Sequence, residues 1–377
     1  MILEAYKCRL YPNEEQKVFL ERHFGASRWI YNWGLQKRIE YYQSEKKTLS
    51  IFALANQITH LKKQEDLSWL AEIESQSLRV SLFNLDKAYS RFFREKKGFP
   101  KFKSKKTSKK SFSLTQSVKI DFETEKIKIP LLKTRIKIKI NRIFNGKIKT
   151  VTISKTSTNK YFASILVEES VEIPLKPMIA IEKAVGIDLG LKSFITTSNG
   201  QKFDNPKFLT KSERKLKKEH RRFSKKKKGG LNKEKQRIIL ARAYEKVANQ
   251  RNDFLHKTSK QLIDDNQVDT YCFETLQVQN MMKNHNLAKA ISDVGWSEFV
   301  RQMKYKADWY GKNILQIGTY EPSSKICNSC GLINQTLTLA DREWTCECGA
   351  VLDRDINAAK NIRDIAFAKQ NLIGNKK

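Results

Sequence analysis

The chain has 377 residues, 40% of them hydrophobic, which is enough for two or three domains with cores of their own. It carries 73 lysines and arginines against 40 aspartates and glutamates, a net charge of +33. A charge of this size strains a compact chain by self-repulsion and indicates a polyanionic partner, with nucleic acid ahead of a membrane surface. No stretch resembles a signal peptide or a membrane span, so we expect an intracellular protein without a membrane partner.

The first hundred residues combine a strand with a helical region. "EAYKCRLYP" alternates and places Tyr6, Cys8 and Leu10 on one face, which predicts a short strand. "NEEQ" then resembles a helix capping box with Asn13 as the N-cap, and the pattern stays helical to about Phe93. We therefore expect a strand followed by a group of helices.

A series of short strands follows between Val118 and Val167. "RIKIKINRI" places isoleucines on one face and lysines on the other, and two further alternating stretches come after it. This succession predicts a small β-barrel. The N-terminal strand could pair with these strands, which would make the helices an insertion into the barrel.

The second half begins after a linker with two prolines, "EIPLKPMIAIEKA". "AVGIDLGLKSFITTSNG" predicts a hairpin of two strands, and residues 208–265 are expected to be helical and strongly basic. Further strands are predicted at "VDTYCFETLQ" and "NILQIGTYEP", and a last helix from about Asn357. The final residues are expected to be frayed.

Acidic side chains interrupt or end these apolar segments. Asp188 lies within an apolar strand, where a carboxylate is costly unless it binds something. Glu274 ends a second strand, and Asp353 and Asp355 lie close to the start of the last helix. Taken singly, Glu274 would more often be a turn residue and either aspartate a helix N-cap. Together, carboxylates on two strands and a helix start suit a two-Mg²⁺ site for phosphodiester cleavage, the layout of a ribonuclease-H-like fold.

Four of the six cysteines lie close together near the end of the chain. Their spacing is C-x-x-C, a gap of 15 residues and C-x-C, and the residues are Cys327, Cys330, Cys346 and Cys348. Four thiolates at this spacing fit a tetrahedral structural Zn²⁺, and a closed set leaves no open position for catalysis. Cys8 and Cys272 are expected to be core thiols.

Basic residues cluster in two segments. Eleven lie between Lys211 and Lys228, and several more in "GFPKFKSKKTSKKSF". A run of like charges is commonly a solvated face, but beside a nuclease site phosphate contact is the better interpretation. The predicted nucleic-acid contacts are Lys211, Arg214, Lys215, Lys218, Arg221, Arg222, Lys225, Lys101, Lys103, Lys105, Gln76 and Arg354.

Several of these segments, taken together, resemble one family. "GIDLGLKSF", "ANQRNDFLHKTS", "PSSKICNSCG" and "DRDINAAKNI" are similar to signature stretches of TnpB, the insertion-sequence OrfB family related to type V CRISPR effectors. The resemblance extends over nearly the whole chain. It departs at Leu352, where the family often has histidine, and in the tight C-x-C pair.

The resemblance implies an RNA-guided DNA endonuclease of a prokaryotic transposable element, acting in the cytoplasm at the nucleoid. Its partners would be a guide RNA from the transposon end and double-stranded DNA beside a short motif, with one protein per guide favoured. The family's catalytic triad maps onto Asp188, Glu274 and Asp355, which would hold Mg²⁺, and leaves Asp353 outside the site.

The resemblance also implies the domain plan. A wedge-type β-barrel would comprise residues 1–12 and 112–172, with a helical recognition lobe inserted at 13–111. A split RuvC-like nuclease domain would span 180–325 and 350–366, with a zinc ribbon at 326–349 and a flexible tail at 367–377.

Three alternatives remain open. A guided DNA-binding repressor would not cut, but such relatives lose triad carboxylates and this chain keeps all three. A transposase would act without RNA. A nonspecific nucleic-acid-binding protein would leave the three carboxylates unexplained.

Overall fold

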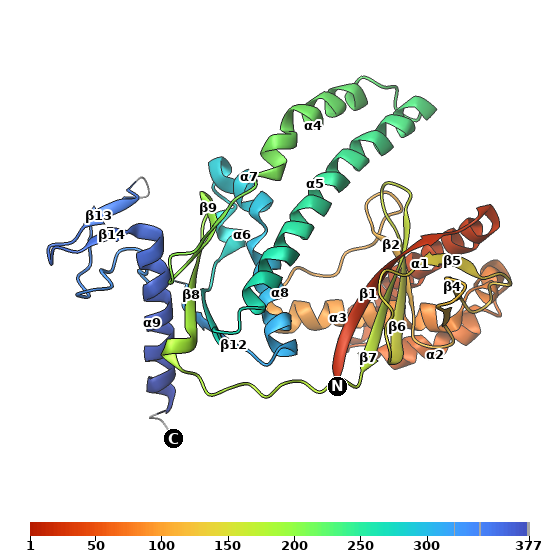
Figure 1. The fold of residues 1–377 in the computed structure, drawn as a ribbon. Helices are drawn as coiled ribbons and strands as arrows, with labels where there is room; N and C mark the ends of the chain where they lie inside the picture. The colour runs from red at the N-terminus through yellow and green to blue at the C-terminus, as the bar shows by residue number, and fades with distance from the viewer. Residues whose placement is uncertain (320, 339–340, 375–377) are drawn as a thin grey trace. The chain divides into compact units, whose positions relative to one another are not determined.

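The computed structural model describes residues 1–319, 321–338 and 341–374, which Figure 1 shows in colour from red to blue. The chain divides into two compact units, Met1–Val171 and Glu172–Lys377. Within the described residues, no helix is long and apolar enough to cross a membrane.

The first unit is a curled antiparallel sheet of seven strands with helices between its first two strands. Its elements are β1 (Ile2–Tyr11), α1 (Glu14–Glu45), α2 (Ile51–Leu61), the 3₁₀ helix η1 (Glu65–Glu72), α3 (Ser75–Glu95), β2 (Lys110–Leu114), β3 (Lys119–Asp121), β4 (Lys126–Lys128), β5 (Ile136–Lys139), β6 (Lys147–Lys155) and β7 (Tyr161–Glu169). The strand order is β2-β6-β7-β1-β5-β4-β3. No pairing joins β2 to β3 among the described residues, so closure into a barrel remains a prediction.

The N-terminal stretch is a strand, as the alternation of its side chains predicts, and it lies inside this sheet. β1 pairs with β7 on one side, from Ile2 opposite Glu169 to Leu10 opposite Tyr161, and with β5 on the other. The capping box that starts α1 is also confirmed, because Asn13 and Gln16 exchange side-chain hydrogen bonds at 2.8 and 3.0 Å. The helices α1 to α3 are thus inserted between strands of one sheet.

The second unit is a mixed five-stranded sheet with helices on both faces. Its elements are η2 (Ile181–Lys183), β8 (Ala184–Leu189), β9 (Ser193–Thr197), β10 (Lys202–Asp204), α4 (Phe208–Ser224), α5 (Leu231–Ile263), β11 (Thr270–Glu274), α6 (Val278–Met281), α7 (His285–Val294), α8 (Trp296–Trp309), β12 (Asn313–Ile317), β13 (Glu343–Thr345), β14 (Val351–Asp353) and α9 (Arg354–Gly374). The strand order is β10-β9-β8-β11-β12. β8, β11 and β12 run parallel, whereas β9 is antiparallel to both of its neighbours, β8 and β10.

Successive side chains of β11 point to opposite faces of the sheet and pack against different helices. In β11, Tyr271 and Phe273 pack with residues of α5 and α8, whereas Cys272 packs with Ile362 and Ala366 of α9. Side chains of a strand point to opposite faces in turn. Glu274 therefore points to the face that α9 covers.

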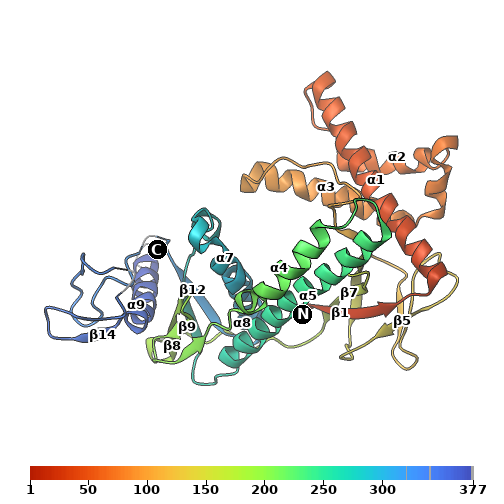
Figure 2. The same cartoon turned by 90° about the horizontal axis from the view of Figure 1, so that it is seen from above.

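The basic region 208–265 is helical as expected, but it consists of two antiparallel helices. α4 and α5 lie side by side and extend away from the sheet of this unit (Figures 1 and 2). The connection at 225–230 contains Gly229 in a left-handed conformation, φ +84°, which glycine adopts without a steric penalty.

The last helix differs from the prediction at both ends. It begins at Arg354 and not near Asn357, because Asp353 caps it. It also continues to Gly374, so most of the segment expected to be a flexible tail is helical. Ile365 and Phe367 pack against the apolar cluster on this face of the sheet, which extends the helix. Residues 375–377 lie outside the described residues.

Candidate nuclease site and four-cysteine site

Two of the three predicted carboxylates lie on neighbouring parallel strands. β8 and β11 pair with Ile187 opposite Phe273, so Asp188 and Glu274 follow at equivalent positions. Their side chains point to the face covered by α9, because Val185, Ile187 and Phe273 belong to the opposite core. The strands thus place both carboxylates under the same helix.

The third carboxylate comes from the first turn of that helix. α9 contacts β8, β11 and β12, and its first residues follow β14 directly. Gly186 allows the close approach: a Cβ built there would lie 1.8 Å from the carbonyl oxygen of Ala359. The close packing of α9 on β8 sets Asp355 near Asp188.

Burial raises the pKa values of two carboxylates of the site, and repulsion adds to the shift of one of them. Burial raises the pKa of Asp188 to about 7, with further contributions from the charges of Asp355 and Glu274, while Arg354 opposes the shift. Burial also raises the pKa of Glu274 to about 7. Carboxylates forced together in a water-poor site are destabilised when charged, and a bound cation would relieve that strain.

The two aspartates near the start of α9 have different environments. Asp353 Oδ1 accepts hydrogen bonds from the backbone N–H groups of Asp355 and Ile356, both at 3.0 Å, and its Oδ2 lies 2.6 Å from Lys202 Nζ. Asp355 instead faces Arg342, whose Nη1 lies 3.6 Å from Asp355 Oδ1. Asp353 is therefore engaged as a helix cap, whereas Asp355 has a long ion pair as its one side-chain partner among the described residues.

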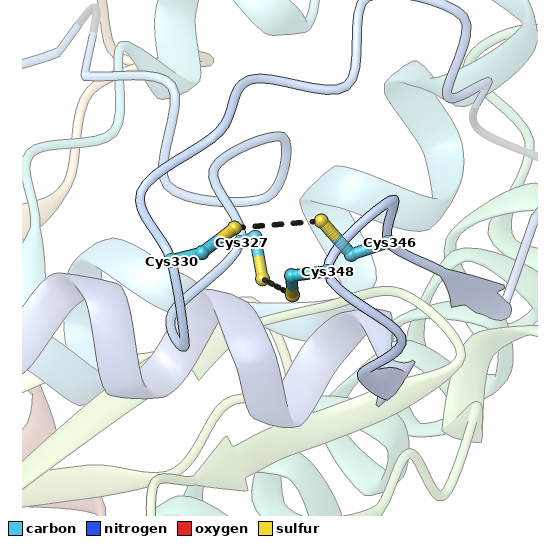
Figure 3. Close-up of side chains that lie close together, drawn as sticks. All are labelled: Cys327, Cys330, Cys346 and Cys348. Atoms are coloured by element: carbon cyan, nitrogen blue, oxygen red, sulfur yellow. Dashed lines mark hydrogen bonds between the residues drawn. The ribbon is translucent and has the colours of Figure 1, made fainter.

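The four cysteines converge on one point in the second unit (Figure 3). All four sulfurs lie within 4.8 Å of one another, with Cys327 and Cys348 at 3.8 Å and Cys330 and Cys346 at 3.6 Å. Thiolates about 2.3 Å from a tetrahedral zinc lie roughly 3.8 Å apart, so the arrangement is compatible with Zn²⁺. The carboxylates do not form such a compact group among the described residues.

Two asparagines of α9 form hydrogen bonds with the loop that carries the first cysteine pair, Cys327 and Cys330. Asn361 Nδ2 donates to the carbonyls of Ser323 and Ile326, each at 2.7 Å, and Asn357 Nδ2 also donates to Ile326 at 2.6 Å. In return, the backbone N–H of Asn328 donates to Asn357 Oδ1 at 2.9 Å. The helix that carries Asp355 therefore also holds the four-cysteine site.

Most of the predicted basic contacts are exposed. Arg214, Lys218, Arg221, Arg222 and Lys225 border one recess with Lys217, which the sequence prediction omitted. Their spacing of three and four residues places them on one face of α4. The remaining predicted lysines Lys211, Lys215, Lys101 and Lys105 are also exposed.

Three other predicted contacts are already engaged or half-buried. Lys103 lies with its Nζ 3.7 Å from the centre of the Tyr31 ring. Arg354 Nη1 donates to the carbonyl of Thr338 at 3.0 Å, and Gln76 is half-buried near the start of α3.

The sequence prediction missed the residues that support the carboxylates. Lys202 lies 151 positions from its partner Asp353. Arg342 lies closer to its partner Asp355, but across the second cysteine pair, and no local pattern marks either residue. The two asparagines of "NAAKNI" lie four residues apart, and on a helix this spacing is the one local signal that could have indicated a shared contact.

Three family models match the chain. A model described as "Probable transposase" matches residues 164–285, one described as "Cas12f1-like, TNB domain" matches 296–362, and one described as "Helix-turn-helix domain" matches 1–47. In the structure, the last range begins with strand β1 and continues as the single helix α1.

Whole-length relatives carry consistent names. The chain is 38% identical over 365 residues to a "Putative RNA-guided DNA endonuclease" of Streptomyces pristinaespiralis, covering 96% of this chain and 89% of the relative. It is 31% identical over 376 residues to "Putative RNA-guided DNA endonuclease InsQ" of Escherichia coli, covering 96% and 91%. It is 22% identical to "TnpB-like protein L79" of Acanthamoeba polyphaga mimivirus over 402 residues, covering 97% and 74%.

A solved structure shares the fold. The protein in a cryo-EM structure of a Cas12f1–sgRNA–target DNA complex matches with a TM-score of 0.59 at 14% sequence identity, covering 96% of this chain and 98% of that one. At this identity the likeness establishes a common fold.

Proposed function

We propose that this chain, which belongs to the TnpB family, cuts double-stranded DNA next to a short motif under the direction of a guide RNA. The relatives' names motivate the activity. The observation that carries it is the convergence of Asp188 and Glu274 on the face of the sheet beneath α9, whose first turn bears Asp355.

The sheet supports a ribonuclease-H-like, RuvC-like nuclease domain. In its order β10-β9-β8-β11-β12, the strands β10, β9 and β8 pair antiparallel, and β11 and β12 run parallel to β8. The helix α9 packs across the sheet. Ligands of open α/β sheets bind outside the carboxyl ends of parallel strands. Asp188 and Glu274 occupy those ends in β8 and β11.

The donor set fits magnesium. All three side chains offer carboxylate oxygens, which Mg²⁺ prefers. Burial raises the pKa values of Asp188 and Glu274, with repulsion adding to the shift of Asp188, and a divalent cation would stabilise their charged forms. When bound, two Mg²⁺ ions would supply the charge that activates the attacking water and stabilises the leaving oxygen of the phosphodiester. The three carboxylates would hold them.

The protein's other residues position the substrate and the helix. Arg342 and Arg354 partly neutralise the carboxylates, and Asp353 fixes the start of α9. The basic face of α4 is suited to the phosphate backbone of a guide–target duplex, as in other guided nucleases that grip by charge and shape. The four-cysteine site, filled by zinc, would act structurally.

The test is plasmid cleavage in Mg²⁺. Protein copurified with RNA transcribed from its native flank would be compared with the Asp188→Asn variant, which keeps the side chain's shape but removes its charge. We expect guide-dependent double-strand cuts by the wild type and at least a thousandfold loss in the variant, as large losses follow removal of a group that acts as part of a unit.

The contrary results separate the alternatives. Cutting by wild-type protein without RNA would favour a transposase or plain nuclease. Tight guided binding without cutting would favour the repressor. Equal cutting by the wild type and Asp188→Asn would remove Asp188 from the site.

A further inference from the structure

A small polar pocket in the first unit lies where α1, α3 and β2 meet. Its lining includes Ser27 and Arg28 of α1, Asn84 of α3, and the segment Ser108–Ser113 at the start of β2. Its volume is about 50 Å³. Since one water needs only about 10–15 Å³ on this measure, the space admits a group larger than a single water, such as a phosphate.

The pocket contains polar groups that the protein itself does not satisfy. Ser27 is 5% exposed, and its Oγ is buried without a hydrogen-bond partner. Among the described residues, the side chains of Arg28, Asn84 and Lys109 make no hydrogen bond or ion pair. A buried hydroxyl without a protein partner is costly unless a water or a ligand satisfies it, so Ser27 Oγ is available to a bound group.

The charge of the lining selects an anion. Arg28, Lys103, Lys109 and Lys110 all line the pocket, and no aspartate or glutamate does. Lys110 is paired with Glu21 at 2.9 Å, and Lys103 lies over the Tyr31 ring. Within the part of the chain that the structure describes, this leaves Arg28 and Lys109 as the cations without a partner. Guanidinium, ammonium, hydroxyl and amide groups together are the donors that bind phosphate oxygens.

We propose that this pocket binds one phosphodiester group of a nucleic acid, with Ser27 Oγ, Arg28, Asn84 and Lys109 as its donors. The identity of the anion rests on the proposed function, since guided cleavage provides two phosphodiester sources, the guide RNA and the target DNA. The pocket holds the strand by its backbone and reads no base.

The experiment measures binding as a function of salt for Arg28→Gln and Lys109→Gln. One arm titrates fluorescein-labelled guide RNA with protein, and the other titrates labelled target duplex with the preassembled protein–RNA complex. The matched control is Arg22→Gln, an arginine of the same helix whose guanidinium is already paired with Glu72. Thermal melting checks folding, and exposed Lys109 provides a variant in which packing is little disturbed.

We expect each pocket variant to bind one probe roughly tenfold more weakly at about 0.1 M salt. The slope of log K against log salt should fall in magnitude by about 1, as for one lost phosphate contact. The probe affected identifies the strand as RNA or DNA, and Arg22→Gln should retain the wild-type slope. Weaker binding with an unchanged slope would show a structural role and overturn the site.

Failure of the inference and failure of the proposed function are distinguishable. If the wild type binds guide RNA and target but the pocket variants keep its affinities and slopes, the pocket proposal is wrong and guided cleavage stands. If the wild type binds neither the guide RNA nor the target duplex, the proposed function is wrong. The pocket proposal then fails as well, because no phosphodiester ligand remains for it.

Discussion

The two aspartates near the start of α9 show how neighbouring carboxylates acquire different roles. Burial by itself would raise the pKa of Asp353, but its hydrogen bonds with Lys202 and with the backbone of Ile356 and Asp355 outweigh that effect and lower it. Asp353 is thus held as an anion at the N-terminus of α9, where the helix dipole favours negative charge.

Substitution should separate these roles. Asp353→Ala removes the cap and should lower the free energy of unfolding by about 1 kcal/mol while retaining part of the cleavage. Asp353→Asn should restore most of the stability, because asparagine also caps. Asp355→Asn should abolish cutting with little change in stability. Urea unfolding and plasmid cleavage measure both effects, and equal loss of cutting from Asp353→Asn and Asp355→Asn would undo the assignment.

Gly186 is required for a reason that only the packed structure shows. A Cβ there would lie 1.8 Å from Ala359 O and 3.0 Å from Arg363 N, both backbone atoms of α9 that cannot rotate away. Gly186→Ala should therefore lower the free energy of unfolding by about 1–3 kcal/mol or more and displace Asp355, reducing cleavage further than the stability loss explains.

Gly25→Ala is the matched control, since nothing lies within 4 Å of a Cβ at this glycine in α1. It should be neutral or stabilise by up to about 1 kcal/mol, because alanine favours a helix. Chemical denaturation of both variants tests the contrast, and a Gly186→Ala protein as stable as Gly25→Ala would show that α9 can shift without cost.

At the scale of elements, α9 couples the two candidate metal sites. Its Asn361 donates two hydrogen bonds to the loop of the first cysteine pair, and its first turn carries Asp355. Asn361→Ala would leave the carbonyls of Ser323 and Ile326 with fewer donors, at a cost of about 1–3 kcal/mol.

We expect Asn361→Ala to release zinc to a chelator faster and to cut DNA more slowly. Gln370→Ala, an exposed change on the same helix, should alter neither. Chelator-dye release and cleavage rates test the coupling. Faster zinc loss with unchanged cleavage would show that the two sites are independent.

A buried lysine lies between α5 and α8, and its shifted pKa should make the stability of the protein depend on pH. Lys306 Nζ donates to the carbonyl of His256 at 2.9 Å and to Ser259 Oγ at 2.7 Å, and the residue is 7% exposed. Burial lowers the pKa of Lys306 to about 8, with a contribution from the charge of Lys260. In the unfolded chain it returns to about 10.4.

Between these two values the unfolded chain binds more protons, so stability should rise with pH through this window. The rise amounts to about 3 kcal/mol at most. Urea unfolding at several pH values should show it in the wild type and lack it in Lys306→Met, which cannot titrate. If the free energy of unfolding changed with pH in the same way for the wild type and for Lys306→Met, the lowered pKa of Lys306 would be contradicted.

At the scale of the whole molecule, local patterns predicted elements better than their assembly. Alternation and a capping box located β1 and α1, and an acid within an apolar strand singled out Asp188. The pairing of β1 with β7 joins residues more than 150 positions apart, and no local period encodes it. Contacts such as Gly186 with α9 depend on packing between elements, and so they appear only in the folded chain.

The net charge of +33 also belongs to the whole molecule. In the free protein, salt screens repulsion among like charges, so its melting temperature should rise as NaCl increases from about 0.05 to 0.5 M. In the complex with guide RNA, salt weakens the phosphate contacts, and affinity should fall by about 10³ or more over part of this range.

A thousandfold loss of affinity removes about 4 kcal/mol of the stabilisation that the RNA provides. The melting temperature of the complex should therefore fall with salt while that of the free protein rises, until the two converge. Differential scanning fluorimetry across the same salt series measures both trends. If the melting temperatures of the free protein and of the complex both rose, or both fell, with salt, the excess positive charge would not serve to bind a polyanion.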